Sequence, residues 1–373
     1  MISILVVTQE NPTGLNYHRQ LIPHAHLDRN YGIEYRIDMT YNINTFTEND
    51  LSNFDIVTFL RIVSEKDDTI EIINKCKRSG CKVIIDIDDY WKLHKHHELM
   101  DVYIKKNYQK KCLDGLVNAD YVTTTTEIFA NKIREYNKNV IVLPNSIDEF
   151  EPQFKREPIS SDRLRFGWIG GIFHIPDIRL MYEGFKEVNK ADTSKFQLCL
   201  GGFGNNDQYQ FIEKIYTDNY RSLKDKEYIH YLKSYTDDNN DEMSISQPYK
   251  RLYGTDVFNY ARLYNSIDIA LIPLESNAFN RYKSQIKIIE AGYFKKPVIV
   301  SNVEPYTIDC TKDNSILINP DKRNSGWGVA LKSIIRNPEK VKDQGEALHE
   351  LVMSKYIMDV VNKVRHEFYQ SIT

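Results

Sequence analysis

The first half of the chain alternates short apolar runs with longer segments in which apolar residues recur every three or four positions. The short runs predict strands and the longer segments predict helices. Alternation of this kind predicts an α/β fold with a doubly wound parallel sheet and right-handed crossovers. The predicted strands lie at about 2–7, 33–38, 55–61, 81–87, 120–125 and 139–143, and the helices at 15–28, 66–79, 98–117 and 126–136.

The second half repeats this alternation after a charged, proline-interrupted stretch at 149–163, which has no apolar period and predicts a linker. An Asp/Asn-rich insertion at 236–246 predicts a surface loop. We therefore expect domains at 1–148 and 164–353, followed by a helical segment at 354–373. The predicted strands of this half are 164–169, 196–201, 227–233, 267–273, 297–301 and 314–318.

Composition agrees with two domains. A chain of 373 residues is too long for one ordinary domain, and its apolar content of 41% and charged content of 27% are typical of soluble globular proteins. No apolar run approaches the ~20 residues that span a bilayer, and no signal peptide is evident. The five cysteines have no metal-ligand or redox spacing, so we expect a cytoplasmic protein. The net charge of −3 does not favour nucleic-acid capture.

Three loops of the first half follow strands, at 8–19, 61–64 and 86–97. Ligands of doubly wound sheets bind beyond the carboxyl ends of the strands. Gly14 in the first loop would let a ligand approach the backbone closely, and a helix carrying Tyr17 and Arg19 follows it.

The third of these loops is the most polar, and it has three interpretations. Asp86 and Asp88 form a carboxylate pair that would suit a divalent metal with a diphosphate. The nearby histidines at 94, 96 and 97 would suit a transition metal, although their spacing does not converge on one helix face. Alternatively, Asp88 and Asp89 bind the hydroxyl groups of a sugar or an acceptor. A solvated acidic strand end is the simplest alternative.

The stretch from Lys283 to Phe294 predicts a helix with functional polarity. Lys283, Lys287 and Glu290 fall on one face, and the amide groups and dipole of the helix start favour an anion there. A nucleotide diphosphate sugar needs this pairing, with cations for the diphosphate and a carboxylate for the ribose hydroxyls. The alternative is an amphipathic helix with a solvated charged face.

Another polar strand end lies at Gly170 and Gly171, which follow the predicted strand 164–169. Adjacent glycines allow backbone amides to approach a phosphate or a sugar. His174 follows them, and Asp177 can open the next helix.

The segment IKIIEAGYFKKPVIVS, which contains Glu290, resembles the donor site of GT-B glycosyltransferases, in particular the retaining family four. That family carries a Glu-x7-Glu pattern, and Glu290 matches its second Glu. Tyr282 occupies the position of the first Glu, and Glu275 lies seven residues before it. The chain is closer to a branch reading FNxxKSxxKxxEAG, in which Lys283 and Ser284 replace the usual glycines. The segments VLPNSID and GWIGG also resemble this superfamily.

This resemblance implies two Rossmann-like domains facing across a cleft, with the last helix crossing back to the first domain. It implies transfer of a sugar from a nucleotide-diphosphate sugar to an acceptor hydroxyl, with retention of configuration and without a metal or a cofactor. The leaving diphosphate can itself assist deprotonation of the acceptor. Because the family's phosphate-binding Arg and Lys are absent after strand 164–169, we expect Lys283 and Lys287 to replace them.

The expected site residues follow from the motifs and the resemblance together. The catalytic candidates are Lys283, Asp88 and His174. The donor-binding candidates are Gly170, Gly171, His174, Lys283, Ser284, Lys287 and Glu290. The acceptor-binding candidates are Gly14, Tyr17, Arg19, Arg61, Asp88 and Asp89.

The sequence leaves the partners open. The donor's sugar and base are undetermined, and so are the oligomeric state and the choice of Tyr282 or Glu275 as replacement for the first Glu. The acceptor is a glycan, a lipid-linked sugar or a modified nucleobase. The alternatives to an ordinary glycosyltransferase are an enzyme that acts on a modified DNA base and a non-catalytic GT-B-like binding protein.

Overall fold

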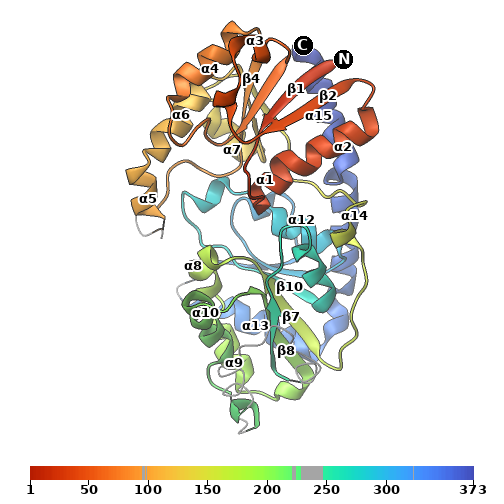
Figure 1. The fold of residues 1–373 in the computed structure, drawn as a ribbon. Coiled ribbons are helices and arrows are strands. Elements are labelled where there is room, and N and C mark those ends of the chain that lie inside the picture. The colour runs from red at the N-terminus through yellow and green to blue at the C-terminus, as the bar shows by residue number, and fades with distance from the viewer. Residues whose placement is uncertain (95–96, 98, 221–223, 228–246, 322) are drawn as a thin grey trace. The chain divides into compact units, whose positions relative to one another are not determined.

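The computed structural model describes residues 1–94, 97, 99–220, 224–227, 247–321 and 323–373 (Figure 1). It divides into two compact units. The first unit contains residues 1–148, 277–285 and 355–373, and the second contains 149–276 and 286–354. The chain thus enters the first unit a second time at 277, immediately before the predicted donor helix, and leaves it again at 285.

The first unit is built on a parallel sheet in the order β2-β1-β3-β4-β5-β6. All six strands predicted in this half are present, and the predicted doubly wound architecture is confirmed. The order reverses direction between β1 and β3, which makes the carboxyl ends of these neighbouring strands the expected ligand site. The strands are β1 (Ile2–Val7), β2 (Tyr35–Thr40), β3 (Ile56–Leu60), β4 (Lys82–Ile87), β5 (Tyr121–Thr124) and β6 (Val140–Val142).

Helices cover both faces of this sheet (Figure 1). One face packs Ile4 and Val6 against Leu27 and Tyr369, which belong to the adjacent helices α2 (Ile22–Tyr31) and α15 (Met358–Ile372). The opposite face packs against α4 (Thr69–Arg78), α6 (Tyr108–Asn118) and α7 (Glu127–Ile133). The shorter helices are α1 (Gly14–Asn16), α3 (Glu48–Leu51) and α5 (Met100–Lys105).

Two predicted helices of the first unit are interrupted. The helix predicted at 98–117 is divided into α5 and α6 because Asn107 adopts a left-handed conformation, with φ of 51°. The helix predicted at 15–28 contains a π-helical turn over Tyr17–Leu21 between α1 and α2. Such turns occur frequently at functional sites.

The second unit has a parallel sheet in the order β12-β11-β10-β7-β8-β9. Its strands are β7 (Leu164–Ile169), β8 (Phe196–Phe203), β9 (Tyr249–Tyr253), β10 (Ile269–Ile272), β11 (Val298–Ser301) and β12 (Ile316–Ile318). β9 was not predicted, because Lys250 and Arg251 interrupt its apolar pattern. The predicted strand 227–233 lies, apart from residue 227, outside the described residues, and so does the predicted loop 236–246.

Helices also flank this second sheet. α8 (Ile175–Arg179), α9 (Tyr182–Asn189), α10 (Asp207–Thr217) and α13 (Ser325–Arg336) pack on one face around the buried Trp168 and Trp327. Elsewhere in this unit, α12 (Ile286–Tyr293) and α14 (Lys342–Lys355) approach each other where Gly292 meets Leu348 and Val352. Among the described residues, no helix is long and apolar enough to cross a membrane.

Two details of the second half differ from the sequence prediction. α12 begins at Ile286, so Lys283 is not part of the helix that carries Lys287 and Glu290. Lys283 is instead extended (φ −66°, ψ 161°) after a 3-10 turn at Asn280–Tyr282, and it belongs to the first unit. The predicted linker 149–163 is partly packed, because Phe154 is buried against the rings of Tyr293 and Phe294.

Two histidines, His18 in the π-helical turn and His24 in α2, are buried and stay neutral. His24 donates from Nδ1 to the carbonyl oxygen of Gln20 (2.7 Å) and accepts at Nε2 from the Tyr369 hydroxyl (3.2 Å). Burial, together with the charge of Arg365, lowers the pKa of His24 to about 3. Burial and the charge of Arg19 lower the pKa of His18 to about 3 as well.

We expect these histidines to make the first unit sensitive to acid. Unfolded histidine takes up a proton below its usual pKa of 6.5, whereas the folded side chains do not until about pH 3. Stability is therefore lost as the pH falls below 6.5, by about 2 kcal/mol for each histidine at pH 5. His24→Gln keeps one donor and one acceptor, so its thermal midpoint should fall less than that of the wild type between pH 7 and pH 5. An equal fall in both proteins would contradict this explanation.

Candidate functional site

The order of the second sheet places its expected ligand site between β7 and β10. These neighbouring strands connect onward in opposite directions, and their carboxyl ends form the switch point at which doubly wound sheets bind ligands. Gly170 and Gly171 follow β7, Glu275 follows β10, and α12 begins later in the β10 loop. The predicted donor residues Gly170, Gly171 and Lys287 thus meet at one sheet edge.

Lys287 marks this edge with a positive charge. Its Nζ donates to the carbonyl oxygen of Ile169 at the end of β7 (2.7 Å) and lies 4.9 Å from the centre of the Trp168 ring. A Cβ atom on Gly170 would collide with the buried Trp168 ring as well as with Nζ, so a larger residue would displace one of them. A Cβ on Gly171 would meet no atom within 4 Å, which leaves the backbone accessible there. An ammonium group beside an open backbone suits an anion.

Asp177 joins the two loops of this switch point. Its carboxylate accepts from Nδ1 of His174 after β7 (2.8 Å) and from the backbone N–H of Glu275 after β10 (2.8 Å). Asp177 is buried, whereas His174 is partly exposed. The structure therefore holds His174 in a fixed orientation at the edge, as a carboxylate does for a catalytic imidazole.

Glu290 lies one turn further along α12 from Lys287 and is almost completely buried. Its carboxylate accepts hydrogen bonds from the hydroxyl groups of Tyr260 and Tyr264, the latter at 3.0 Å. Burial raises the pKa of Glu290 to about 7, against the opposing effects of Tyr260, Lys287 and Tyr264. A carboxylate that already accepts from hydroxyl groups is suited to bind the hydroxyls of a ribose. Tyr260 and Tyr264, which lie on a 3-10 helix at Tyr260–Ser266, were not among the site residues expected from the sequence.

In the first unit, the three predicted loops follow β1, β3 and β4, which are neighbours in the sheet. Arg19 and Asp86 form a buried pair there, with Nε and Nη2 donating to the two carboxylate oxygens (2.8 and 2.7 Å). Tyr17 is also buried, whereas Gly14 opens α1 in open space. Because Arg19 and Tyr17 expose almost no surface, their contact with an acceptor stays a prediction, and their visible role is to support this edge.

Arg61, Asp88 and Asp89 form a second and more accessible cluster at the same edge. Arg61 donates from Nε to Asp88 (2.7 Å) and from Nη2 to Asp89 (2.5 Å). Its backbone is left-handed, with φ of 59°, a strained conformation that is typical of functional sites. Burial and the charge of Asp89 raise the pKa of Asp88, while Arg61 opposes them. Burial lowers the pKa of Arg61, but both aspartates outweigh it and raise this pKa well above its usual value.

The segment 277–285 is anchored to the first unit by hydrogen bonds that sequence reasoning did not foresee. Asn145 of the VLPNSID motif donates from Nδ2 to the Ser284 hydroxyl (2.9 Å), and its Oδ1 accepts from Nη1 of Arg19 (3.1 Å). Gln285 donates to the hydroxyl of Tyr356 (2.9 Å). The Nζ of Lys283 lies 5.0 Å from the centre of the Phe279 ring. A hydrogen-bonded chain therefore runs from Asp86 through Arg19 and Asn145 to Ser284.

Tyr282 and Glu275, the two candidates for the missing first Glu, have different surroundings. The Tyr282 ring packs against Tyr90 and Phe129 in the first unit, with centroids 4.8 and 5.5 Å apart. Glu275 stands at the carboxyl end of β10 in the second unit, and its side chain is exposed. Of the two, Glu275 therefore lies on the unit that carries Lys287 and Glu290.

Two of the three histidines of the third loop, His94 and His97, lie within the described residues. His94 and His97 have ring centroids 5.4 Å apart, and His96 lies outside the described residues. Within the described ranges, no group of three or more His, Cys, Asp or Glu side chains is placed to hold a metal ion. Metal independence stays a prediction.

The predicted site residues thus form two groups. Gly170, Gly171, His174, Lys287 and Glu290 lie at the switch point of the second unit, and Gly14, Tyr17, Arg19, Arg61, Asp88, Asp89, Lys283 and Ser284 belong to the first unit.

Comparisons with known proteins identify the fold. Neither a scan against protein-family models nor a search among curated proteins finds a match. Among solved structures, sucrose-phosphate synthase from Thermosynechococcus elongatus is 11% identical with a TM-score of 0.66, and the alignment covers 100% of this chain and 99% of that one. Anabaena Alr3699/HepE in complex with UDP and glucose is 11% identical with a TM-score of 0.64, over all of both chains. A glycosyltransferase from Rickettsia africae is 15% identical with a TM-score of 0.59, over 100% and 98% of the two chains. The resemblance seen in the sequence is thereby confirmed at the level of the fold: the chain has the GT-B fold of two Rossmann-like units that these glycosyltransferases share.

Proposed function

We propose that the protein is a glycosyltransferase that moves a sugar from a nucleotide-diphosphate sugar to an acceptor hydroxyl. The observation that carries this proposal is the switch point of the second unit. There the ammonium group of Lys287, the open backbone of Gly171 and the buried carboxylate of Glu290 lie on the loop after β7 and on α12, which follows β10. These groups match a diphosphate and a ribose, in that order along α12.

The solved structures of the same fold support a nucleotide sugar as the donor. Anabaena Alr3699/HepE was solved with UDP and glucose and also with UDP-glucose. We propose that Lys287 and the backbone of Gly170 and Gly171 bind the donor diphosphate, that Glu290 binds the ribose, and that His174 contacts the transferred sugar. Lys283 and Ser284 of the first unit stay donor-binding candidates from the sequence, and we propose that Arg61, Asp88 and Asp89 bind the acceptor.

The first test is a thermal-shift screen of the full chain against UDP-, GDP-, ADP- and CDP-sugars. Binding to the folded state stabilises it by about 2.7 kcal/mol at a hundredfold excess over the dissociation constant. One nucleotide series should raise the midpoint, and the stabilising donor should be hydrolysed slowly when no acceptor is present. The absence of any shift at millimolar donor would contradict the proposal, and binding without hydrolysis would indicate a non-catalytic binding protein.

Retention of configuration and independence of metals are further parts of this proposal. The anomeric configuration of the sugar released by donor hydrolysis can be read by NMR before mutarotation, and an α-linked donor should release the α-anomer. Turnover in the presence of a chelator should equal turnover in buffer. Loss of turnover that manganese or magnesium restores would instead assign Asp86 and Asp88 to a metal.

We expect Asn145 to act as a positioning residue through Ser284. Asn145→Ala removes the donor to Ser284 and an acceptor for Arg19, so it should lower kcat by about tenfold and also the thermal midpoint. Ser284→Ala, which leaves Arg19 paired with Asn145, should lower kcat to a similar extent with little loss of stability. If the two residues act together, the double variant should be no slower than Asn145→Ala alone. Additive losses of kcat would contradict this coupling.

A further inference from the structure

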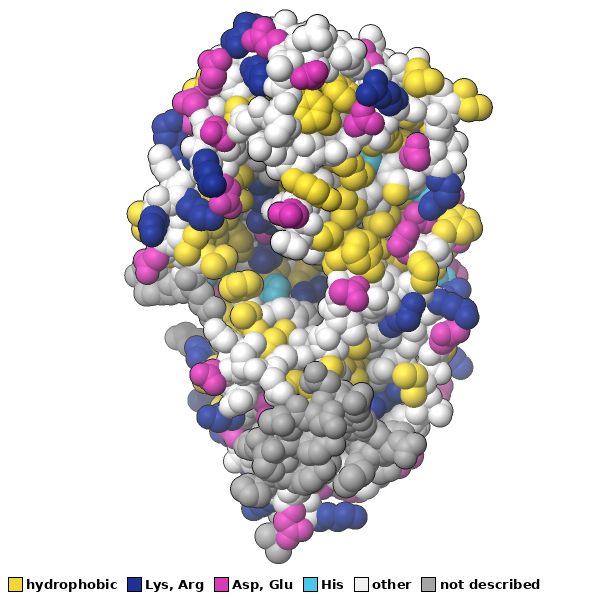
Figure 2. All heavy atoms as spheres, in the orientation of Figure 1, with side chains coloured by type: hydrophobic (Ala, Val, Ile, Leu, Met, Phe, Trp, Pro, Cys, Tyr) yellow, Lys and Arg dark blue, Asp and Glu magenta, His cyan; other side chains and the backbone are white. Residues whose placement is uncertain are grey.

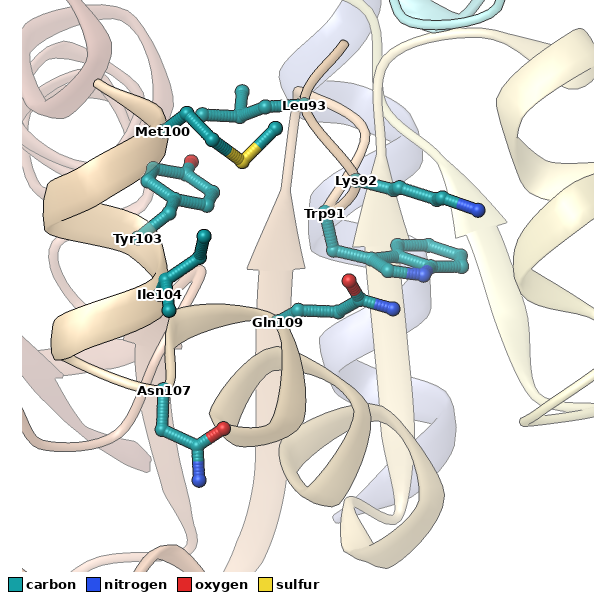
Figure 3. A pocket seen from close by; sticks show the side chains of 8 residues that line it. All are labelled: Trp91, Lys92, Leu93, Met100, Tyr103, Ile104, Asn107 and Gln109. Atoms are coloured by element: carbon teal, nitrogen blue, oxygen red, sulfur yellow. The ribbon is translucent and has the colours of Figure 1, made fainter. Parts of the chain in front are cut away.

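A pocket of about 300 Å³ lies in the first unit, beside the cluster of Arg61, Asp88 and Asp89. It is formed between the loop that follows β4 and the α5–α6 hairpin, and no predicted site residue lines it. Figure 3 shows Tyr103 and Ile104 of α5 on one side and Trp91 with Gln109 on the other, while Leu93 and Met100 meet at one end.

The chemistry of the lining is that of a carbohydrate site. Tyr103, Ile104 and Leu93 supply aromatic and aliphatic surface, on which the C–H face of a pyranose ring can pack. The side-chain amides of Gln109 and Asn107 supply both donors and acceptors for hydroxyl groups. Binding pockets typically combine a mainly apolar lining with a few polar groups in this way.

The pocket is coupled to the acceptor cluster by contacts within the unit. The rings of Tyr103 and Tyr108 stack with centroids 4.4 Å apart. Burial raises the pKa of Tyr108 to about 12, and the positive charge of Arg61 opposes this shift. Burial likewise raises the pKa of Tyr103, on which the charges of Arg61 and Asp89 also act. A ring in the pocket would therefore lie next to the carboxylates that we assign to the acceptor.

Lys92 is the one charged residue among the described residues that line the pocket, and three other lysines nearby are held by partners, which favours a glycan over a nucleic acid. Lys106 pairs with Glu65 (2.7 Å) and Lys110 with Asp114 (2.5 Å). Lys111 donates to the carbonyl oxygen of Glu65 (2.6 Å). On the visible face of the first unit, basic and acidic side chains are interspersed (Figure 2). Nucleic-acid sites instead gather basic residues on one face.

We propose that this pocket is a subsite for a sugar ring of a glycan acceptor, next to the residue whose hydroxyl is glycosylated. The inference rests on the proposed function and specifies its acceptor. It assigns Tyr103, Ile104 and Gln109 to acceptor recognition, a role that lies outside the residues expected from the sequence.

Matched variants of α5 test the subsite without knowledge of the natural acceptor. The probes are methyl glycosides of common hexoses and N-acetylhexosamines, measured by saturation-transfer difference NMR on the full chain. Ile104 and Val102 are both exposed on the same short helix, but only Ile104 lines the pocket. Ile104→Asn should weaken glycoside binding and Val102→Asn should not. Tyr103→Ala should weaken it by about tenfold, the loss expected for one aromatic contact.

The possible results separate the subsite from the donor assignment, since donor binding is measured in parallel by thermal shift. Nucleotide-sugar binding without any glycoside binding would overturn the subsite and leave the proposed function standing. Glycoside binding that Ile104→Asn weakens would support the subsite even if no nucleotide sugar bound. Equal binding by Ile104→Asn and Val102→Asn would overturn it. The subsite would also be overturned if the protein selectively bound an oligonucleotide with 5-hydroxymethyl pyrimidines and Ile104→Asn abolished that binding.

Discussion

Replacing Lys287 by alanine is expected to lower kcat by about a hundred- to a thousandfold, the effect of removing one preorganised charge-stabilising group from an active site. The Nζ of Lys287 is fixed by the Ile169 carbonyl and the Trp168 ring at the end of β7. Negative charge on the diphosphate grows as the bond to the sugar breaks, so the ammonium stabilises the transition state more than the bound donor. The donor KM should therefore change less than kcat.

Steady-state kinetics on Lys287→Ala and on Lys332→Ala test this expectation. Lys332 is an exposed lysine of α13 that pairs with Glu187, and its removal should change neither kinetic constant. Lys283→Ala belongs in the same series, because Lys283 lies outside α12 and is held in the first unit. A kcat for Lys287→Ala within twofold of the wild type would remove Lys287 from the diphosphate site.

The second large effect is expected from Glu290→Gln. This variant should bind the donor more weakly and yet be more stable than the wild type at pH 8. The ionised carboxylate accepts from ribose hydroxyls, and a charged hydrogen bond of this kind contributes about 1.5–3 kcal/mol. Because the ribose does not change during transfer, the variant should raise the donor KM by about ten- to a hundredfold with little change in kcat. The wild-type KM should also rise as the pH falls through about 7, whereas that of Glu290→Gln should not.

The stability of the same variant follows from the direction of the pKa shift. Folded Glu290 keeps its proton up to about pH 7, whereas the unfolded side chain loses it near 4.5. Burying the ionised carboxylate therefore costs stability as the pH rises between these values, by ~3 kcal/mol above pH 7. Glu290→Gln should raise the thermal midpoint at pH 8, and this gain should vanish at pH 4.5. Glu346→Gln, an exposed control on α14, should show neither effect. A lower midpoint for Glu290→Gln at pH 8 would contradict the burial argument.

A stabilising variant that loses donor affinity would identify Glu290 as a residue retained for function at a cost in stability. Structural carboxylates behave in the opposite way. Asp86, for example, is buried in a bidentate pair with Arg19, and its removal would leave a buried charge without its partner.

The local pattern of the sequence was sufficient for the strands of the first unit. Every predicted strand of the first half is present, because runs such as KVIIDI are apolar on both faces and can only be buried in a parallel sheet. The motif around Glu290 located helix α12 for the same reason, since its apolar face and its glycine at 292 are fixed by packing. The order of the strands then placed Gly170, Gly171 and Lys287 at one switch point.

The tertiary structure determined where helices begin and break, which local periodicity does not indicate. Helical spacing put Lys283 on the same face as Lys287, but Ser284 and Gln285 bond to Asn145 and Tyr356, so the chain stays extended until Ile286. These partners lie 139 and 71 residues away in the sequence. The apolar period also continued through Asn107, where the backbone turns left-handed and creates one wall of the proposed sugar pocket. The pattern of apolar residues within an element indicates which of its faces is buried. The hydrogen-bond partners of its polar side chains often lie far away in the sequence, so they are set only when the chain folds.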